Sequence, residues 1–390
     1  MQRRAMLIKL GKNRLQAYLT GIFLLLSGFS LQAAESDSLP VLNQGQKWRL
    51  AYYQGGEYYD YYQYLKATTE GLMVQGWITP ETIPDQLATA RDLWRWLAEN
   101  AHSDYLEFLP DGFYSAGWDR NYRTVLRERA ITRLNQKNEV DLLLALGSWA
   151  GIDMAVDRHS VPTMVISVSD PRSIGLIRDP GNAYQHIYVT EDPLRYERQV
   201  VLFHDLIRFK TLGVAYEDSF EGRSYASVDT IQRLAEERNF KVVSCFTKSD
   251  IADQSLANQS VVNCFRELVA KVDAVYVTVQ GGVNSDTIPV LVDIANQHRI
   301  PTFSQYGQNE VKQGYLMSLS QARGFSEEGQ MLADVAIDIF NGAEPASLAS
   351  HSAEANRITL NLKTAEQIGL YLNAELLAAA DQLFWQIEQP

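Results

Sequence analysis

Short, largely apolar runs alternate with longer segments of helical periodicity along most of the chain. Residues 141–146 and 163–168 are two such runs, and they end at Gly147-Ser148 and Ser169-Asp170-Pro171. Runs of this kind are typical of parallel strands that are buried on both faces. The pattern therefore predicts an α/β fold built on parallel sheets.

The same alternation occurs in both halves of the chain, without a repeat at the level of the sequence. Further strands are expected at residues 47–53, 105–109, 211–216, 241–246, 273–279 and 301–304. Helices are expected at residues 85–100, 120–135, 194–207, 224–238, 259–270 and 287–298, and residues 68–72 belong to the helix after the first strand. In the helix at 120–135, Val125, Leu126, Ile131 and Leu134 share one face.

The N-terminus has the layout of an export signal. Basic residues between Arg3 and Arg14 precede an apolar run at 18–31, and small residues at Ala33 and Ala34 offer a cleavage site. The alternative is an uncleaved anchor, for which the run is short and interrupted by polar residues. We expect residues 1–33 to be a cleaved signal peptide and the mature protein to be periplasmic. No cysteine lies near the cleavage site, so we do not expect a lipoprotein.

Composition narrows the possible partners. The chain is 46% hydrophobic and 21% charged, a balance typical of globular domains, and its net charge is −12. This negative charge argues against nucleic acid and against anionic membrane surfaces as partners.

The chain contains two cysteines, Cys245 and Cys264. In an exported protein such a pair suggests one disulfide, and a bridge that closes a short loop typically contributes about 3 kcal/mol. The alternative is two buried free thiols. Two cysteines and scattered histidines supply too few ligands for a metal site, so none is expected.

The last third of the chain carries a family resemblance. Asp273-Ala-Val-Tyr-Val-Thr-Val is followed by Gly281-Gly282, then by Arg299-Ile-Pro-Thr-Phe-Ser-Gln, and later by Arg357-Ile-Thr-Leu-Asn-Leu. This order resembles the solute-binding proteins of ABC transporters, in the family that includes tryptophan and tyrosine binders. The resemblance implies a type I periplasmic-binding-protein fold, no cofactor, a monomer that binds a small-molecule ligand, and a permease in the inner membrane as partner.

The resemblance also implies two Rossmann-like lobes that close about a multi-crossover hinge. The N-terminal lobe is expected to hold residues 46–185 and 306–342, and the C-terminal lobe residues 186–305 and 343–390. Residues 315–320 and a helix at 327–340 would rejoin the first lobe. A strand at 356–362 and a helix at 373–386 would return to the second.

Ligands of open parallel sheets bind beyond the carboxyl ends of the strands, so the loops there hold the candidate residues. The first such loop has six tyrosines within residues 52–62, around a glycine pair. Glycines permit close approach of the backbone, and tyrosine faces suit rings or cations. The candidates are Tyr53, Gly55, Gly56, Tyr58 and Tyr59, and the alternative is a packed loop and helix start.

Two later loops of the first lobe add further candidates. Ser148 and the amides at the following helix start can donate to an anion or a carbonyl. Trp149 is either a lid over the ligand or a core residue. Ser169 and Asp170 match the family pattern, although an Asp before Pro also organises turns.

In the second lobe, Tyr216, Ser219, Arg223 and Ser224 follow a strand and open a helix. In amino-acid-binding relatives this helix start holds a carboxylate, and a helix N-terminus favours anions. Ser224 can equally be only an N-cap.

Gln280, Gln305 and Tyr306 complete the candidates. Relatives often carry acids where this chain has Gln280 and Gln305-Tyr306, and those acids pair with the amino group of the ligand. Neutral amides cannot balance an ammonium, so we expect a polar, aromatic or anionic molecule rather than an ordinary α-amino acid.

An enzyme on a similar scaffold is the rival class. The chain has no Gly-x-Gly-x-x-Gly after its first strand, no Walker loop and no Gly-x-Ser-x-Gly elbow. We therefore expect no catalytic residues. A ligand-sensing partner of a signalling receptor remains the second alternative.

Overall fold

The computed structural model describes residues 39–136, 138–178, 181–182, 184–321, 324–348 and 356–388. The chain divides into Met1–Leu39 and Pro40–Pro390, and the architecture below is that of the second unit. The expected signal peptide at residues 1–33 lies outside the described residues.

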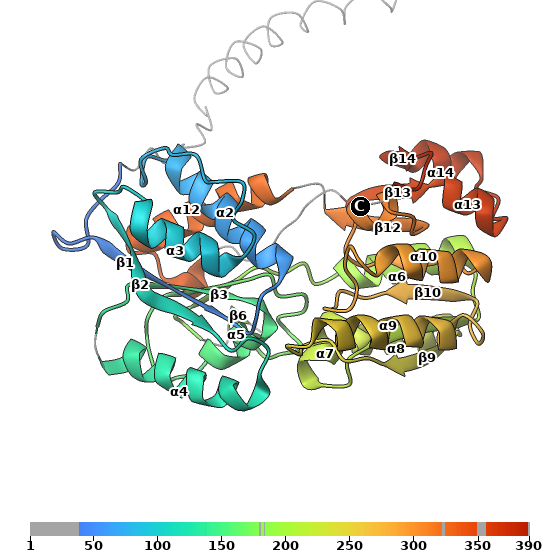
Figure 1. Cartoon of the computed structure of the whole chain (residues 1–390), viewed down its shortest axis with the longest axis horizontal. Helices are drawn as coiled ribbons and strands as arrows, with labels where there is room; N and C mark the ends of the chain where they lie inside the picture. The colour runs from blue at the N-terminus through green and yellow to red at the C-terminus, as the bar shows by residue number, and fades with distance from the viewer. Residues whose placement is uncertain are drawn as a thin grey trace, which may run out of the picture. The chain divides into compact units, whose positions relative to one another are not determined.

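The first sheet has five parallel strands in the order β2-β1-β3-β4-β7 (Figure 1). Its strands are β1 (Trp48–Gln54), β2 (Leu106–Ser115), β3 (Leu142–Leu146), β4 (Thr163–Ile166) and β7 (Ile187–Val189). A small antiparallel pair, β5 (Ile177–Arg178) and β6 (Gly181–Asn182), lies outside this sheet.

Helices cover both faces of the first sheet. Leu50 and Tyr52 of β1 belong to the core under α2 (Tyr59–Val74), α3 (Ala90–Asn100) and α12 (Phe325–Phe340). Ala51 and Tyr53 belong to the core under α4 (Arg120–Gln136) and α5 (Gly147–Met154). Successive residues of one strand thus face opposite layers, as strand geometry requires.

The second sheet has seven strands in the order β14-β13-β12-β11-β10-β8-β9. Within the described strands of this sheet, β12 and β13 pair antiparallel and the other neighbours pair parallel. Its strands are β8 (Thr211–Tyr216), β9 (Lys241–Phe246), β10 (Ala274–Val277), β11 (Thr302–Ser304), β12 (Met317–Gln321), β13 (Asn356–Asn361) and β14 (Gln382–Phe384).

Two hydrophobic cores flank the second sheet, one on each face. One contains residues of α6 (Arg195–Ile207), α8 (Val228–Arg238), α13 (Leu362–Ile368) and α14 (Ala374–Ala379). The other contains residues of α9 (Gln254–Leu268) and α10 (Ile288–Gln297). Shorter helices are α7 (Phe220–Tyr225), α11 (Gln308–Lys312) and a 3-10 turn at Pro345–Ser347. We call each sheet with its helices a lobe.

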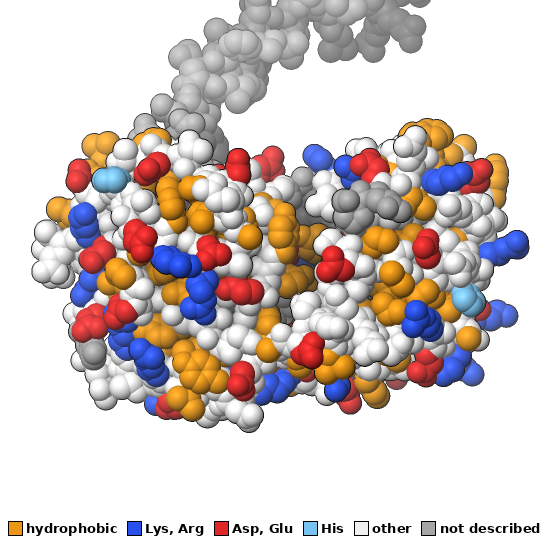
Figure 2. All heavy atoms as spheres, viewed as in Figure 1, with side chains coloured by type: hydrophobic (Ala, Val, Ile, Leu, Met, Phe, Trp, Pro, Cys, Tyr) orange, Lys and Arg blue, Asp and Glu red, His pale blue; other side chains and the backbone are white. Residues whose placement is uncertain are grey.

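The chain passes between the lobes after β7, between β12 and α12, and between α12 and β13. The α/β class with parallel sheets and a multi-crossover connection is thus confirmed. Acidic and basic side chains are interspersed on the visible face of the molecule (Figure 2).

Several elements differ from the sequence-based expectation. A lobe boundary at residue 186 assigns β7 to the second lobe, whereas β7 pairs with β4 in the first sheet. Residues 315–320 were expected in the first lobe, whereas β12 pairs with β11 and β13 in the second sheet. Each strand pairs with strands that are distant in the sequence, and the hydrophobic pattern of a segment does not indicate which sheet edge it joins.

Helix boundaries also shift, for local reasons. The expected helix at 85–100 begins only at Ala90, where the Thr89 hydroxyl accepts a hydrogen bond from the Asp92 amide at 3.1 Å. The expected helix at 224–238 is split into α7 and α8 by Ser227, which has a φ of +53°. The expected helix at 373–386 ends at Ala379, and β14 then pairs with β13.

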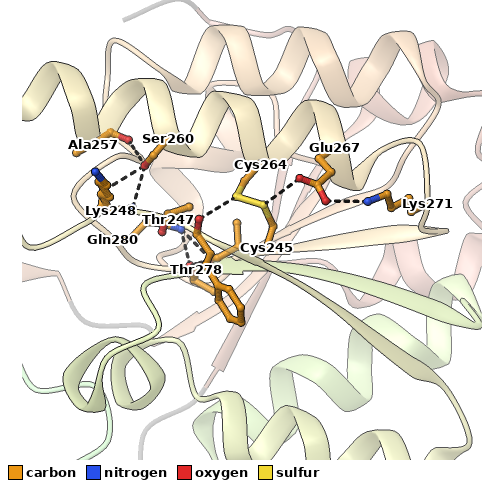
Figure 3. Close-up of a disulfide and its surroundings, with 12 residues drawn as sticks. Cys245, Thr247, Lys248, Ala257, Ser260, Cys264, Glu267, Lys271, Thr278 and Gln280 are labelled. Carbon is orange, nitrogen blue, oxygen red and sulfur yellow. Dashed lines mark hydrogen bonds and ion pairs between the residues drawn. A yellow bond between two sulfur atoms is a disulfide. The ribbon is translucent and has the colours of Figure 1, made fainter.

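Cys245 and Cys264 form the expected disulfide, which joins β9 to α9 (Figure 3). Just after β9, the Thr247 hydroxyl donates to the Gln280 side-chain oxygen at 2.6 Å, and the Lys248 amide donates to the Ser260 hydroxyl at 3.0 Å. The bridge therefore anchors the start of the loop at 247–250 from the side of the helix.

Removing the bridge with the double variant Cys245→Ser/Cys264→Ser should lower the free energy of unfolding by about 3 kcal/mol, because the cysteines are 19 residues apart and the bridge restricts the unfolded chain. Urea unfolding monitored by circular dichroism measures the change. Wild-type protein in reductant should match the variant in oxidising buffer. Equal stability of the oxidised wild type and the variant would contradict this role.

Glycines let α12 pack closely against α2, although the two helices are far apart in sequence. A Cβ at Gly71 would come within 2.8 Å of the Ala333 Cβ, and a Cβ at Gly329 would overlap the Ala67 backbone and side chain. The Gln75 amide donates to Asp334 across the same pair at 2.8 Å. This contact attaches the returning chain to the first lobe.

The variant Gly329→Ala should lower the free energy of unfolding by about 1–3 kcal/mol, since overpacking the α2–α12 contact outweighs the better helix propensity of alanine. Gly324→Ala is the matched control, because nothing lies within 4 Å of a Cβ there. Chemical denaturation compares the two variants. An equal or higher stability of Gly329→Ala than of the control would refute the close-packing argument.

Candidate functional site

Polar side chains at the carboxyl ends of the strands of one sheet meet side chains from the other lobe. Four of the pairs that they form are Trp149 with Asp250 at 3.0 Å, Arg123 with Glu221 at 2.5 Å, Ser173 with Ser224 at 2.6 Å, and Tyr306 with Asp60 at 2.9 Å. We call these four pairs the inter-sheet contact. It occupies the edge where open parallel sheets bind their ligands.

Trp149 reaches this contact because a tight turn follows β3. Gly147 has a φ of +87°, which favours glycine, and a Cβ there would overlap the Tyr61 hydroxyl. The Trp149 side chain is 2% exposed, and its indole Nε1 donates to Asp250 of the other lobe. Trp149 is therefore both a core residue and a residue of the inter-sheet contact.

Arg123 on α4 links acids of both lobes. Its Nε donates to both carboxylate oxygens of Asp153 at 3.0 and 3.1 Å, and its Nη1 donates to Glu221. The guanidinium carbon lies 4.3 Å from the centre of the Trp149 ring, within cation–π range. Burial raises the pKa of Asp153, and the hydrogen bond and charge of Arg123 oppose that rise.

Arg120, also on α4, is linked to the loop at 247–250 through Glu217. Arg120 pairs with Glu217, whose other carboxylate oxygen accepts the amides of Ser249 and Asp250 at 2.8 Å each. Asp250 also accepts the Ser249 hydroxyl at 3.2 Å. Burial raises the pKa of Asp250 to about 7, and the negative charge of Glu217 adds to the rise.

Two further acids lie around Tyr306. Asp60 accepts the Tyr306 hydroxyl, and its pKa is raised to about 6 by burial, against the effect of that hydrogen bond. Glu310 accepts the Ser304 hydroxyl at 2.6 Å, and burial raises its pKa to about 8, with the charge of Asp60 contributing. Both carboxyls therefore titrate well above their ordinary range.

The residues predicted from the tyrosine-rich loop lie in different surroundings. Gly55 and Gly56 lie under the Trp118 ring, which a Cβ at either position would meet too closely. The Tyr53 hydroxyl donates to Asp153 at 2.9 Å inside the first lobe. Tyr58 is half-buried against Tyr61, at 5.4 Å between ring centres, whereas Tyr59 is 63% exposed.

The other candidates of the first lobe lie near the second lobe. Ser148 is 9% exposed in the first turn of α5, beside Trp149. The Asp170 carbonyl accepts the Ser224 hydroxyl at 3.2 Å, and the Asp170 side chain accepts the Ser173 amide at 3.0 Å, which is a turn-forming role. Ser169 is half-buried next to this turn.

Of the candidate residues in the second lobe, only some lie at the inter-sheet contact. Ser219 is the N-cap of α7 and accepts the Gly222 amide at 3.0 Å, and Ser224 lies inside α7, so it is no cap. Tyr216 donates to Ser244 at 3.2 Å within its own lobe. Arg223 pairs with Asp229 at 3.0 Å, an exposed acid.

Gln280 and Gln305 are buried and use their amides within the second lobe. Gln280 donates to the Ala215 carbonyl at 2.8 Å and accepts from Thr247. Gln305 donates to the Tyr225 carbonyl at 2.7 Å and accepts the Val279 amide at 2.8 Å. Both side chains order the loops around them.

Sequence reasoning missed the charged residues of this region, which are Asp60, Arg120, Arg123, Asp153, Glu217, Glu221, Asp250 and Glu310. A usable signal was present for Asp250, because residues 247–250 directly follow a predicted strand. In the described residues, no three His, Cys, Asp or Glu side chains are grouped so that they could hold a metal ion. None of the described helices is long and apolar enough to cross a membrane.

Comparison with solved structures identifies the fold. A conserved domain protein of Vibrio cholerae and an ABC domain in complex with L-Trp from Streptococcus pneumonia each align with a TM-score of 0.62 at 18% identity. Each alignment covers 87% of this chain and 100% of the other. The ligand-free, open structure of a substrate-binding protein with adhesive properties from Clostridium difficile aligns with a TM-score of 0.53 at 18% identity, over 87% of this chain and 99% of the other.

At this level of identity the likeness concerns the fold alone, which is that of type I periplasmic binding proteins. No curated protein matches the chain. A family model described as "ABC transporter substrate binding protein" matches residues 121–384, which is more than half of the chain. The chain therefore belongs to the family of ABC transporter substrate-binding proteins.

Proposed function

We propose that this chain is the periplasmic solute-binding component of an ABC importer, without enzymatic activity. It binds a small polar or aromatic molecule between its lobes and delivers the molecule to an inner-membrane permease by hinge closure. The observation that carries the proposal is the inter-sheet contact, in which the strand ends of two separate sheets meet through polar side chains. Family membership supports the same role.

The pairs of the inter-sheet contact are consistent with hinge closure, because their two members belong to different lobes. Trp149 and Asp250 belong to different lobes, as do Arg123 and Glu221, so each pair forms only when the lobes approach. Each pair replaces hydrogen bonds to water and contributes little net free energy. A ligand that touches both lobes adds differential affinity for the closed state and shifts the equilibrium.

A bound ligand should therefore make the protein more compact. A thermal-shift screen of small metabolites identifies the compound that stabilises the protein most, since a ligand of the native state raises the melting temperature. Small-angle X-ray scattering with that compound should give a smaller radius of gyration than the free protein. A compound that binds tightly and leaves the radius unchanged would refute hinge closure.

Trp149→Phe should weaken binding of the same compound by about tenfold, because it removes the indole donor to Asp250 and leaves the ring in place. Trp94→Phe is the matched control: the Trp94 indole donates to the Leu109 carbonyl at 3.0 Å, inside the first lobe. Calorimetric titration measures both variants. If Trp149→Phe binds as tightly as Trp94→Phe, the Trp149–Asp250 pair has no part in closure.

A further inference from the structure

Two histidines meet at the C-terminal end of α5, away from the inter-sheet contact. His159 lies in the segment before β4, and His186 directly precedes β7. Their ring centres are 4.6 Å apart, and the rings pack edge to face. Both therefore lie at the amino ends of parallel strands of the first sheet, whereas the inter-sheet contact lies at the carboxyl ends.

The two rings share one acceptor, the carbonyl oxygen of Met154, which is the last residue of α5. This oxygen lies 3.0 Å from Nε2 of His159 and 3.3 Å from Nε2 of His186, and it also accepts the Val156 amide at 3.0 Å. Because a carbonyl can only accept, Nε2 of each ring carries the hydrogen, and Nδ1 of each neutral ring is bare. One oxygen thus joins α5 to the segments that lead into β4 and β7.

The surroundings of His159 have no place for a second ring proton. Its side chain is 6% exposed, and its Nδ1 is buried without a hydrogen-bond partner within the described structure. A proton on Nδ1 would create a buried N–H without an acceptor and a buried charge beside the other ring, and both are costly. Burial accordingly lowers the pKa of His159 to about 4, the charge of His186 adds to the fall, and the Met154 hydrogen bond opposes it.

His186 is in a similar but less enclosed position. It is half-buried, and its ring packs against Tyr184 at 5.9 Å between ring centres. Burial lowers its pKa, whereas the Met154 hydrogen bond and the negative charge of Asp157 oppose the fall. The pair as a whole therefore favours the neutral form of both rings.

The charged groups on the neighbouring elements are mostly engaged elsewhere. On α5, the Asp153 carboxylate is bound by Tyr53 and Arg123. Before β4, Arg158 pairs with Glu128 at 2.8 Å, and both are exposed.

Two further elements approach the pair. Arg127 of α4 donates to the Asp153 carbonyl at 3.3 Å, beside the end of α5. Glu344 flanks the 3-10 turn at Pro345–Ser347, in which the Ala346 amide donates to the Gln185 carbonyl at 3.2 Å.

We propose that the His159–His186 pair is an acid-sensitive lock of the first lobe. With both rings neutral, the pair holds the end of α5 to the starts of β4 and β7, and uptake of a proton releases it. The lock is independent of the proposed transport function. Because α5 also carries Trp149, the lock and the inter-sheet contact share one short helix.

The direction of the pH effect follows from proton linkage. The pKa of His159 is lowered on folding, from an ordinary value of 6.5 to about 4. Between these values the unfolded chain binds a proton that the folded chain does not bind. The contribution of His159 to stability is therefore fully present above the ordinary pKa and is lost as the pH falls toward the folded value.

Urea unfolding at about pH 7.5 and about pH 5 compares the wild type with His159→Gln, whose amide still donates to a carbonyl but takes up no proton. Between these two conditions, the unfolding constant of the wild type should rise at least about tenfold more than that of His159→Gln. An equal rise in the two proteins would overturn the lock.

His298→Gln is the matched control. Nδ1 of His298 lies 2.9 Å from the Ile294 carbonyl oxygen near the end of α10, so it has a comparable hydrogen bond on an exposed ring. This variant should keep most of the acid-induced rise of the wild type. If His298→Gln removes the rise as fully as His159→Gln does, the effect does not belong to the pair and the lock is overturned.

Hydrogen exchange of the wild type in the same two conditions needs no substitution and distinguishes a local lock from general acid lability. After correction for the intrinsic pH dependence of exchange, amides of residues 155–161 and 184–189 should lose more protection in acid than those of β8 and β9 in the second lobe. An equal or smaller loss in these two segments would overturn the lock, even if His159→Gln does not fold.

Discussion

The guanidinium of Arg123 is the interaction on which the relation of the two sheets depends. It binds Asp153 of the first lobe with its Nε and Glu221 of the second with its Nη1, and it stacks on Trp149. Arg123, whose side chain is 14% exposed, pairs with Asp153 inside the first lobe and also supplies a counter-charge to Glu221 of the second lobe. Removing one member of such a buried group leaves an uncompensated charge, which is far more costly than the pair itself is stabilising.

The loops that follow the strands near Arg123 have different structural roles. The turn at Gly147 brings Trp149 and Tyr61 together, and the Glu217 carboxylate holds the amides of the loop that carries Asp250. The Cys245–Cys264 bridge fixes the strand from which that loop starts. The position of Asp250 is therefore set from three directions.

Much of the fold can be read from the sequence, because it follows from local pattern. The strands expected at 211–216 and 241–246 agree with β8 and β9 residue for residue, and the disulfide agrees with the expectation from the even cysteine count. The edge chosen by β7 or β12 could not be predicted, because pairing joins residues far apart in sequence. The split at Ser227 also lacks a signal, since serine rarely adopts a positive φ.

Only some of the candidate residues predicted from the sequence lie at the inter-sheet contact. Trp149 and Tyr306 lie at the inter-sheet contact. Tyr216 bonds within its own lobe, and Tyr59 is 63% exposed. The Gln280 and Gln305 side chains form hydrogen bonds within the second lobe. The acids were not predicted, because the two positions at which relatives carry acids hold Gln280 and Gln305 in this chain. Charge at such a contact is a sum over several loops, and only the folded chain shows that Asp60 and Asp250 each accept a hydrogen bond from the other lobe.

The most direct test of this account is a crystal structure of the protein with the ligand that co-purifies from its native host, identified by mass spectrometry. The account predicts electron density between the two sheets, in contact with Tyr61 or Tyr58 of the first lobe and with Asp250 or Tyr225 of the second. Density confined to one lobe, such as the apolar pocket lined by Leu316, Leu360 and Leu376, would contradict it.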